Sequence, residues 1–105
     1  MGVIVFRHML VTNQKMKDVE DFMKKLDNDV RERKVTDFRM ARLQNEIRIM
    51  SKDRMSVQRS GNMQRIERFN NLFVSKLSEL SKIMQTNGFT NRDEIAKMVR
   101  RIKSQ

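Results

Sequence analysis

Apolar residues at helical spacing dominate the second half of the chain and predict a long amphipathic helix over residues 62–87. They recur in steps of three and four, which keeps them on one face of an α-helix. In order they are Met63, Ile66, Phe69, Phe73, Leu77, Leu80 and Met84. Leu72, Val74 and Ile83 widen this stripe, so we expect it to pack against more than one neighbouring helix.

The end of this helix is marked by Asn87-Gly88, because glycine has no Cβ and accepts the left-handed backbone of a helix terminus. Thr90 then predicts the N-cap of a last helix over residues 90–103. Acidic residues follow in its first turn and basic residues in its last turn, which complements the helix dipole. Its predicted core side consists of Ile95, Met98, Val99 and Ile102.

The same spacing recurs twice within residues 13–58. The first stripe contains Met16, Val19, Phe22, Met23, Leu26 and Val30, and the second contains Met40, Leu43, Ile47 and Met50. Thr36 or Asp37 could cap a new helix, but no glycine or proline forces a break. One long helix and two helices, at 14–34 and 37–58, both fit this pattern. The narrow second stripe, with Arg54 in its next place, resembles a short coiled-coil seam.

Together these elements predict an all-α fold in one domain, residues 1–105. Ser60-Gly61-Asn62 is a turn signal that makes the flanking helices antiparallel neighbours. We expect three to four amphipathic helices in a small bundle, with a long antiparallel helical hairpin as the variant if 14–58 is continuous. The absence of proline and the presence of only 3 glycines disfavour a multi-strand fold.

The composition limits how much core one chain can form. Hydrophobic residues make up 38% of the chain and charged residues 34%, so a monomeric core would be thin and a homodimer or larger assembly is expected. Residues 1–12 form an apolar segment that we expect to dock on the helices or across a dimer interface. The predicted partner or dimer interface consists of Val3, Val5, Phe6, Phe69, Phe73, Leu77, Leu80 and Met84.

The net charge of +10 favours polyanionic partners such as nucleic acid. The excess is spread along the chain, and no segment is a basic arm. Residues 39–59 carry the most basic outer face, with the end of the last helix next; a merely solvated helix face is the alternative. The candidate nucleic-acid-binding residues are Arg39, Arg42, Arg48, Lys52, Arg54, Arg59, Arg100, Arg101 and Lys103.

Catalytic and metal-binding chemistry is not indicated. The chain has no cysteine, and its one histidine, His8, has no carboxylate at ligand spacing. We therefore expect no enzyme, no metal and no cofactor. The 10 methionines are expected to fill the core rather than to line an adaptable groove. Base stacking is not expected, because the phenylalanines in the helices fall on apolar stripes; these are Phe22, Phe38, Phe69 and Phe73.

One short stretch, residues 88–95, resembles the turn and second-helix start of ribbon-helix-helix DNA-binding proteins. It has the sequence Gly-Phe-Thr-Asn-Arg-Asp-Glu-Ile. The resemblance implies a strand around residues 64–70 that pairs with a dimer mate and enters the major groove. That segment lacks strand alternation, so the helical interpretation is preferred.

The leading functional hypothesis is a non-enzymatic, basic helical protein that binds nucleic acid through phosphate contacts, in a regulatory or packaging role. The alternative is a protein-interaction module, an adaptor or assembly subunit, that docks a partner through its apolar and methionine-rich stripes. A peripheral membrane protein is a weaker third reading, because no helix combines a basic and a bulky apolar face cleanly. An intracellular location is expected, since no signal peptide or membrane span is visible.

Overall fold

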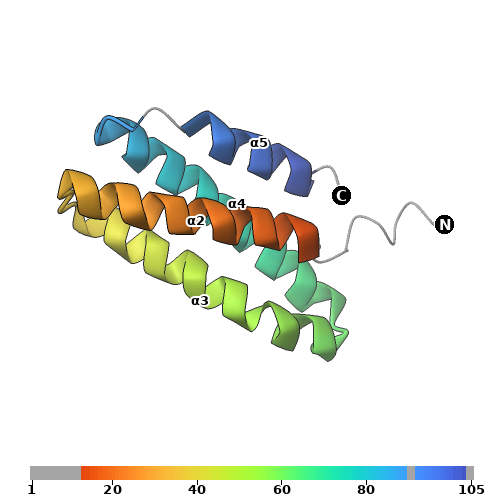
Figure 1. Cartoon of the computed structure of the whole chain (residues 1–105). Helices are drawn as coiled ribbons and strands as arrows, with labels where there is room; N and C mark the ends of the chain where they lie inside the picture. Colours follow the sequence, from red (N-terminus) through yellow and green to blue (C-terminus); the bar gives the residue numbers. More distant parts are fainter. Residues whose placement is uncertain (1–12, 90–91, 104–105) are drawn as a thin grey trace.

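Four helices form an up-down-up-down bundle in the part of the chain that the structure describes (Figure 1). The structure is a computed structural model, and it describes residues 13–89 and 92–103. The helices are α2 (Asn13–Arg33), α3 (Phe38–Ser60), α4 (Met63–Thr86) and α5 (Arg92–Lys103). Each helix packs against two others in the ring α2–α3–α4–α5, so that α2 faces α4 across the core and α3 faces α5. The all-α prediction is confirmed; the N-terminal segment and the Thr90 cap lie outside the described residues.

The ambiguous junction is a break between two helices. Lys34 takes a left-handed backbone with φ 55°, and the N–H of Val35 reaches back to the carbonyl of Val30 at 3.1 Å. This is the geometry in which glycine usually ends a helix, here adopted by a lysine. Asp37 then caps α3, because its side chain accepts a hydrogen bond from the N–H of Arg39. The sequence indicates a cap at the start of α3, but it does not indicate that α2 ends at Lys34.

The other two connections follow their sequence signals. Gly61 ends α3 with φ 60°, and the Asn62 side chain accepts from the first amides of α4 at 3.0 and 3.2 Å. Gly88, with φ 78°, ends α4, and the N–H of Phe89 bonds to the carbonyl of Met84 at 3.0 Å. Phe89 is thereby turned back into the core, where it is only 4% exposed. Both glycines occupy backbone conformations that side chains with a Cβ rarely adopt.

The core draws on every helix and is closed within one chain. The fully buried side chains share its centre: Val19, Leu26, Met40, Leu43, Ile47, Phe73, Leu77, Leu80, Met84 and Ile95. This corrects the predicted partner interface on α4, because its five residues are at most 8% exposed; they are Phe69, Phe73, Leu77, Leu80 and Met84. The remaining predicted interface residues, Val3, Val5 and Phe6, lie outside the described residues. The α4 stripe is covered by α3 on one flank and α5 on the other, so its fully buried centre, Phe73, Leu77, Leu80 and Met84, offers no docking surface.

Some stripe residues lie on the surface instead of in the core. Phe38 is 88% exposed, Met63 45% and Leu72 48%, and Met50 is half-buried. Arg54 differs in the opposite direction. It was predicted to contact nucleic acid at the surface, but it is only 7% exposed and continues the inward stripe of α3. The stripe of α3 packs on both α2 and α4 and is therefore part of a bundle core.

The strand implied by the ribbon-helix-helix resemblance is contradicted. Residues 64–70 lie inside α4, and the cap at Asn62 starts that helix before them. The stretch 88–95 shares with that family only the sequence pattern of a helix end followed by a helix start.

Two leucines of α4, one buried at the centre of the stripe and one half-exposed at its edge, predict mutational effects of different size. Leu77→Ala removes a side chain that is 0% exposed, and we expect it to lower the free energy of unfolding by about 2–5 kcal/mol. Leu72→Ala removes the same atoms from a half-exposed site and should cost less than about 1 kcal/mol. Urea unfolding followed by circular dichroism measures both. Equal losses would mean that α4 is rotated relative to this structure.

Candidate nucleic-acid interface

The nine candidate cations do not form one surface. Six lie on α3 and three on α5, and these two helices occupy opposite corners of the bundle without contacting each other. A ligand that bound one set from outside the bundle would face away from the other. The two sets are therefore separate candidates, and each depends on what its side chains already contact.

Arg54 is removed from the candidate surface by burial. Its side chain lies on the inward face of α3, and its Nη1 atom is 3.7 Å from the sulfur of Met55. An arginine residue that is only 7% exposed cannot contact a phosphate unless its side chain moves out of the bundle. The signal for this placement is its spacing, since position 54 continues the inward series that includes positions 40, 43 and 47.

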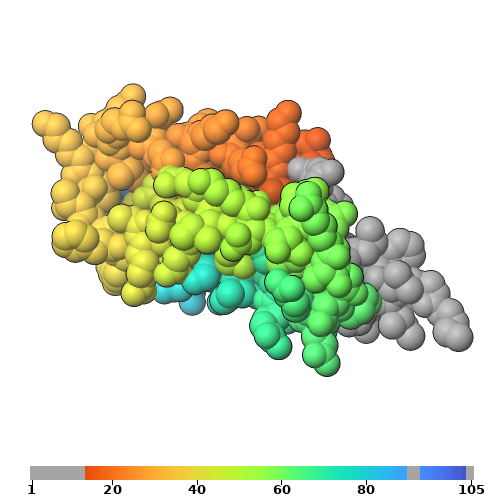
Figure 2. All heavy atoms as spheres, turned by 90° about the horizontal axis from the view of Figure 1, so that it is seen from below, coloured from red at the N-terminus to blue at the C-terminus, as the bar shows by residue number. Residues whose placement is uncertain are grey.

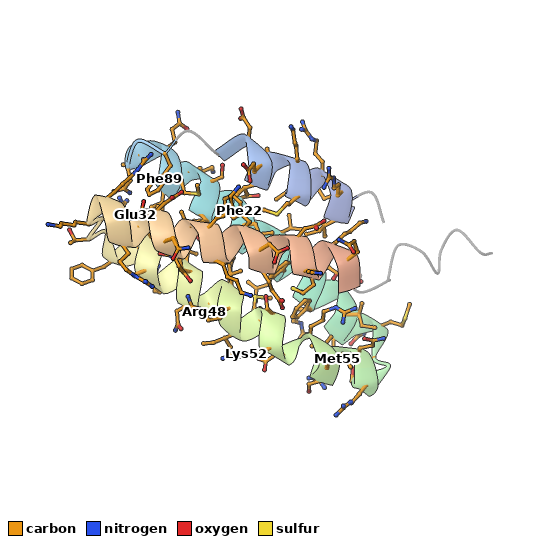
Figure 3. All side chains as sticks on the ribbon, in the orientation of Figure 1. Phe22, Glu32, Arg48, Lys52, Met55 and Phe89 are labelled. Atoms are coloured by element: carbon orange, nitrogen blue, oxygen red, sulfur yellow. The ribbon has the colours of Figure 1, made fainter. Side chains whose placement is uncertain are left out.

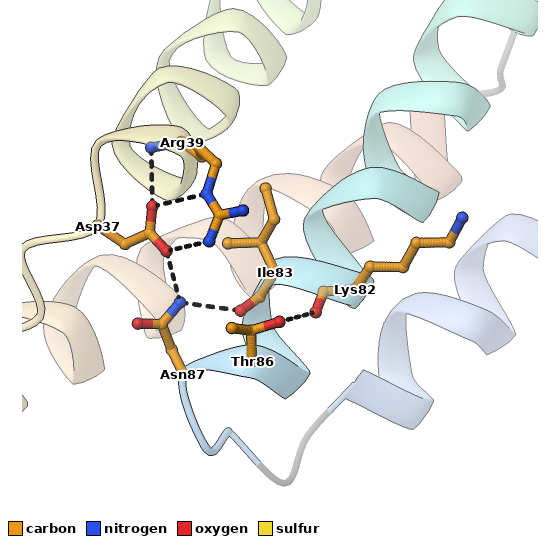
Figure 4. Close-up of polar contacts among 6 residues, drawn as sticks. All are labelled: Asp37, Arg39, Lys82, Ile83, Thr86 and Asn87. Atoms are coloured by element: carbon orange, nitrogen blue, oxygen red, sulfur yellow. Dashed lines mark hydrogen bonds and ion pairs between the residues drawn. The ribbon is translucent and has the colours of Figure 1, made fainter.

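Arg39 is held by the cap of its own helix (Figure 4). Its Nε and Nη2 atoms donate to the two oxygens of Asp37 at 3.3 and 3.1 Å. Asn87 donates to the same carboxylate at 3.0 Å and to the carbonyl of Ile83 at 2.9 Å, which ties the start of α3 to the end of α4. These hydrogen bonds, Arg39 first, hold the pKa of the Asp37 carboxyl well below its usual range and raise the pKa of Arg39. Arg39 is thus paired with the cap of its own helix, although its side chain remains 62% exposed.

Arg48 and Arg42 also have acidic neighbours, but less complete ones. Arg48 Nη2 lies 2.9 Å from Asp27 on α2 and remains 46% exposed. The contact of Arg42 Nε with Glu46 is longer, 3.7 Å, and Arg42 is 67% exposed. Glu46 is engaged mainly by Lys76 of α4, whose hydrogen bond is the first cause of the lowered pKa of that carboxyl. Both arginines keep exposed N–H groups beside their ion pairs, as a bridging guanidinium can.

The exposed cations of α3 gather on its outward side. We define the α3 basic face as Arg42, Arg48, Lys52 and Arg59. With about 100° per residue, the last three lie within about 40° of one another. Arg42 lies about 80–120° from them, close to Glu46 and Asp53 on the flank toward α4. Figure 2 shows α3 crossing the whole lower face of the bundle, and Figure 3 shows Arg48 and Lys52 following each other along it.

Apolar side chains are interleaved with these cations. Ile49 is 49% exposed and Met55 is 50% exposed, on the same outward side of α3. Between this face and α2 lies a shallow cavity of about 210 Å³, with Met23 in its lining and charged residues of both signs. The surface is therefore basic and partly apolar, which suits contact with a polyanion that also exposes flat apolar groups.

The α5 set is balanced by acidic groups of α2. Arg101 Nη1 lies 3.9 Å from Asp18, and Lys15 donates to the carbonyl of Arg101 at 2.7 Å. The cavity between α2 and α5, about 290 Å³, has three acidic and three basic residues in its wall. Arg100 and Lys103 are exposed on α5. α5 has five basic and two acidic residues, so it is also a positive helix, but the ion pair of Arg101 with Asp18 engages one of its three candidate cations.

Other kinds of site are not supported by the described residues. None of the described residues forms a cluster of three or more histidine, cysteine, aspartate or glutamate side chains that could hold a metal ion. No described helix is long and apolar enough to cross a membrane.

Phe38 is the residue whose exposure differs most from its predicted place. It was assigned to the inward stripe, yet it is the most exposed large hydrophobic side chain among the described residues. A signal for this was present, since two positions along a helix turn by about 200°, so that Phe38 must face away from the buried Met40. The position directly after the Asp37 cap leaves no preceding turn of α3 to cover the ring.

Comparisons with protein families, with curated proteins and with solved structures give no match to this chain. Function is therefore inferred from the charge, exposure and contacts of the described side chains.

The Asp37 cluster predicts a defined pH dependence of stability. Because the folded pKa lies below the ordinary value, the ionised carboxylate stabilises the fold above about pH 5. That contribution is lost as the pH falls toward the folded pKa. Asp37→Asn keeps an N-cap acceptor but removes the charge, so we expect the stability gap between wild type and variant to be largest at pH 7 and to shrink at pH 3.

Urea unfolding of both proteins at the two pH values measures this gap. Because the pair is at the surface, the gap should also shrink in high salt. A gap that is the same at pH 7 and pH 3 would contradict the assignment of the ionised carboxylate as the stabilising form.

Proposed function

We propose that this protein is a non-enzymatic, intracellular nucleic-acid-binding protein that uses the α3 basic face for phosphate contacts. The observation that carries the proposal is the uneven charge of the bundle. α2 has six basic and six acidic residues, whereas α3 has six basic and only two acidic ones. α3 therefore has a net charge of +4, compared with +2 for α4 and +3 for α5, which is the largest net charge among the four helices.

The length of the face fits a polyanion. Positions 42 and 59 are separated by roughly 25 Å along a helix that rises 1.5 Å per residue. An extended ligand with regularly spaced phosphates can meet several of these side chains at once, and binding gains free energy from the release of condensed counterions. Such contacts position the protein without reading sequence, which suits a packaging role or a regulatory role with little sequence preference.

A second candidate is a protein-interaction module, and a specific groove favours it. Between α3 and α4 lies a cavity of about 410 Å³ with Leu72, Met50 and Phe69 in its wall, beside Arg65 and Arg68. An acidic helix with an apolar face would complement this lining. A homodimer would also use exposed groups such as Ile49, Met55 and Leu72, because the α4 stripe is covered within the chain.

The salt dependence of binding tests the leading proposal. We expect the full chain to bind a labelled duplex, with a linear decrease of log K against log salt concentration. Lys52→Gln with Arg59→Gln should lower the steepness of that slope by about 2 and weaken binding at low salt. Fluorescence anisotropy across a salt series measures both quantities.

The matched control is Lys17→Gln with Lys25→Gln, which removes the same charge from exposed positions on the neutral helix α2. We expect this variant to change the slope by much less. Equal effects of the two pairs would show that net charge and not the α3 basic face drives binding. Absence of wild-type binding at physiological salt would favour the protein-interaction module.

A further inference from the structure

The connection between α2 and α3 presents an aromatic ring at one end of the bundle, surrounded by basic residues. Phe38 is 88% exposed, whereas the other exposed large hydrophobic side chains in the described part of the chain lie between 45% and 50%. Exposed aromatic rings among basic residues are the usual platforms on which unpaired nucleobases stack. The ring is at the start of α3, and the α3 basic face continues from it along the same helix.

The backbone that carries the ring is anchored. The Asp37 carboxylate caps α3 directly before it, and Asn87 links that carboxylate to the end of α4. Phe38 is the first residue of a helix whose next turn is anchored by the buried Met40 and Leu43. Because the backbone cannot easily move, the ring cannot withdraw into the core, and little ordering is needed when a ligand binds.

A cavity adjoins the ring. Its volume is about 250 Å³, several times the ~30 Å³ that a water molecule occupies in the liquid. Val30, Val35 and Ala41 contribute apolar wall, and Thr36, the Asp37 carboxylate and Gln44 contribute polar groups. The Gln44 amide already donates to Asp27, which leaves its carbonyl oxygen for a ligand. A flat heteroaromatic ring that stacked on Phe38 would thus find both an apolar wall and hydrogen-bonding groups at its edge.

The charge around the ring is positive. Residues 31–42 contain five basic and two acidic residues. Two of the basic side chains are engaged, since Arg33 lies over the ring of Phe89 at 4.8 Å and Arg39 pairs with Asp37. Arg31 and Lys34 are exposed at the end of α2, and Arg42 is exposed one turn after Phe38 on the same side of α3. Phosphates on either side of a stacked base would meet these cations.

We propose that this end of the bundle binds an unpaired base of single-stranded nucleic acid, with Phe38 as the stacking platform and Arg42 and Lys34 as phosphate contacts. The inference rests on the proposed function and deepens it. In a duplex the faces of the bases are covered by their neighbours, so an exposed ring can stack only on a base that is unpaired. Single strands are therefore the preferred ligand, and the α3 basic face carries the rest of the strand.

The test compares a labelled 12-nucleotide single strand with a duplex of the same sequence, in DNA and RNA forms, by anisotropy with the full chain. Phe38→Ala should weaken single-strand binding by about tenfold or more and duplex binding by less than about twofold. Phe38→Leu, which keeps an apolar side chain but no ring, should weaken it nearly as much. Met63→Ala is the matched control, an exposed apolar residue at the start of α4 and outside the α3 basic face, and should change neither affinity.

A direct readout uses Phe38→Trp. The chain contains no tryptophan and no tyrosine, so this variant would carry the sole indole. We expect affinity close to wild type and quenching of the indole fluorescence by single strands but not by the duplex.

The outcomes separate the two proposals. Wild-type single-strand affinity in Phe38→Ala, together with weakened binding in the Lys52 and Arg59 variant, would overturn the stacking site and leave the proposed function standing. An unquenched indole in a complex that still forms would overturn it in the same way. Failure of the wild-type chain to bind any of the four nucleic acids would overturn both.

Discussion

Burial of the α4 apolar stripe between α3 and α5 is the constraint on which the rest of the structure depends. Phe73, Leu77, Leu80 and Met84 are fully buried, and no single neighbouring helix could cover a stripe that wide. The short connections on either side of α4 bring α3 and α5 to its two flanks. α2 then closes the ring by packing on both of them. A chain of modest hydrophobic content thereby buries side chains from all four described helices in one core.

That arrangement determines which side of α3 is available. Its inward side is committed to α2 and α4, and even Arg54 is drawn into the interior by its place in the spacing. The outward side is left with cations and with exposed apolar groups such as Ile49 and Met55. The surface that we assign to nucleic acid is therefore a consequence of how the core is closed. It could not be read from the count of basic residues, because ion pairs such as Arg48–Asp27 and Arg39–Asp37 compensate part of that count.

The sequence predicted an all-α fold of three to four helices because spacing and caps act locally, and only the division of residues 14–58 stayed open. Gly61 and Gly88 end helices as glycines do, and the Asn62 and Asp37 caps are side-chain contacts within one turn. Two features were not predicted: the end of α2 and the surface that covers the α4 stripe. The stop at Lys34 uses a lysine in a conformation normally left to glycine, with the Val35–Val30 hydrogen bond behind it. The assignment of the α4 stripe to a partner failed because the sequence does not say which surface covers it.

The candidate site was predicted only in part, for a related reason. Helical spacing brought Arg48, Lys52 and Arg59 together correctly, since that is a property of one helix. The pairing of Arg48 with α2 depends on tertiary contacts. Phe38 is the instructive case, since its exposure follows from the position of the cap. The Asp37–Asn87 link fixes where α3 begins, and a helix that begins there must turn its first side chain away from Met40. The interaction that stabilises the end of the bundle is thus the one that places an aromatic ring in solvent, next to exposed cations such as Lys34 and Arg42.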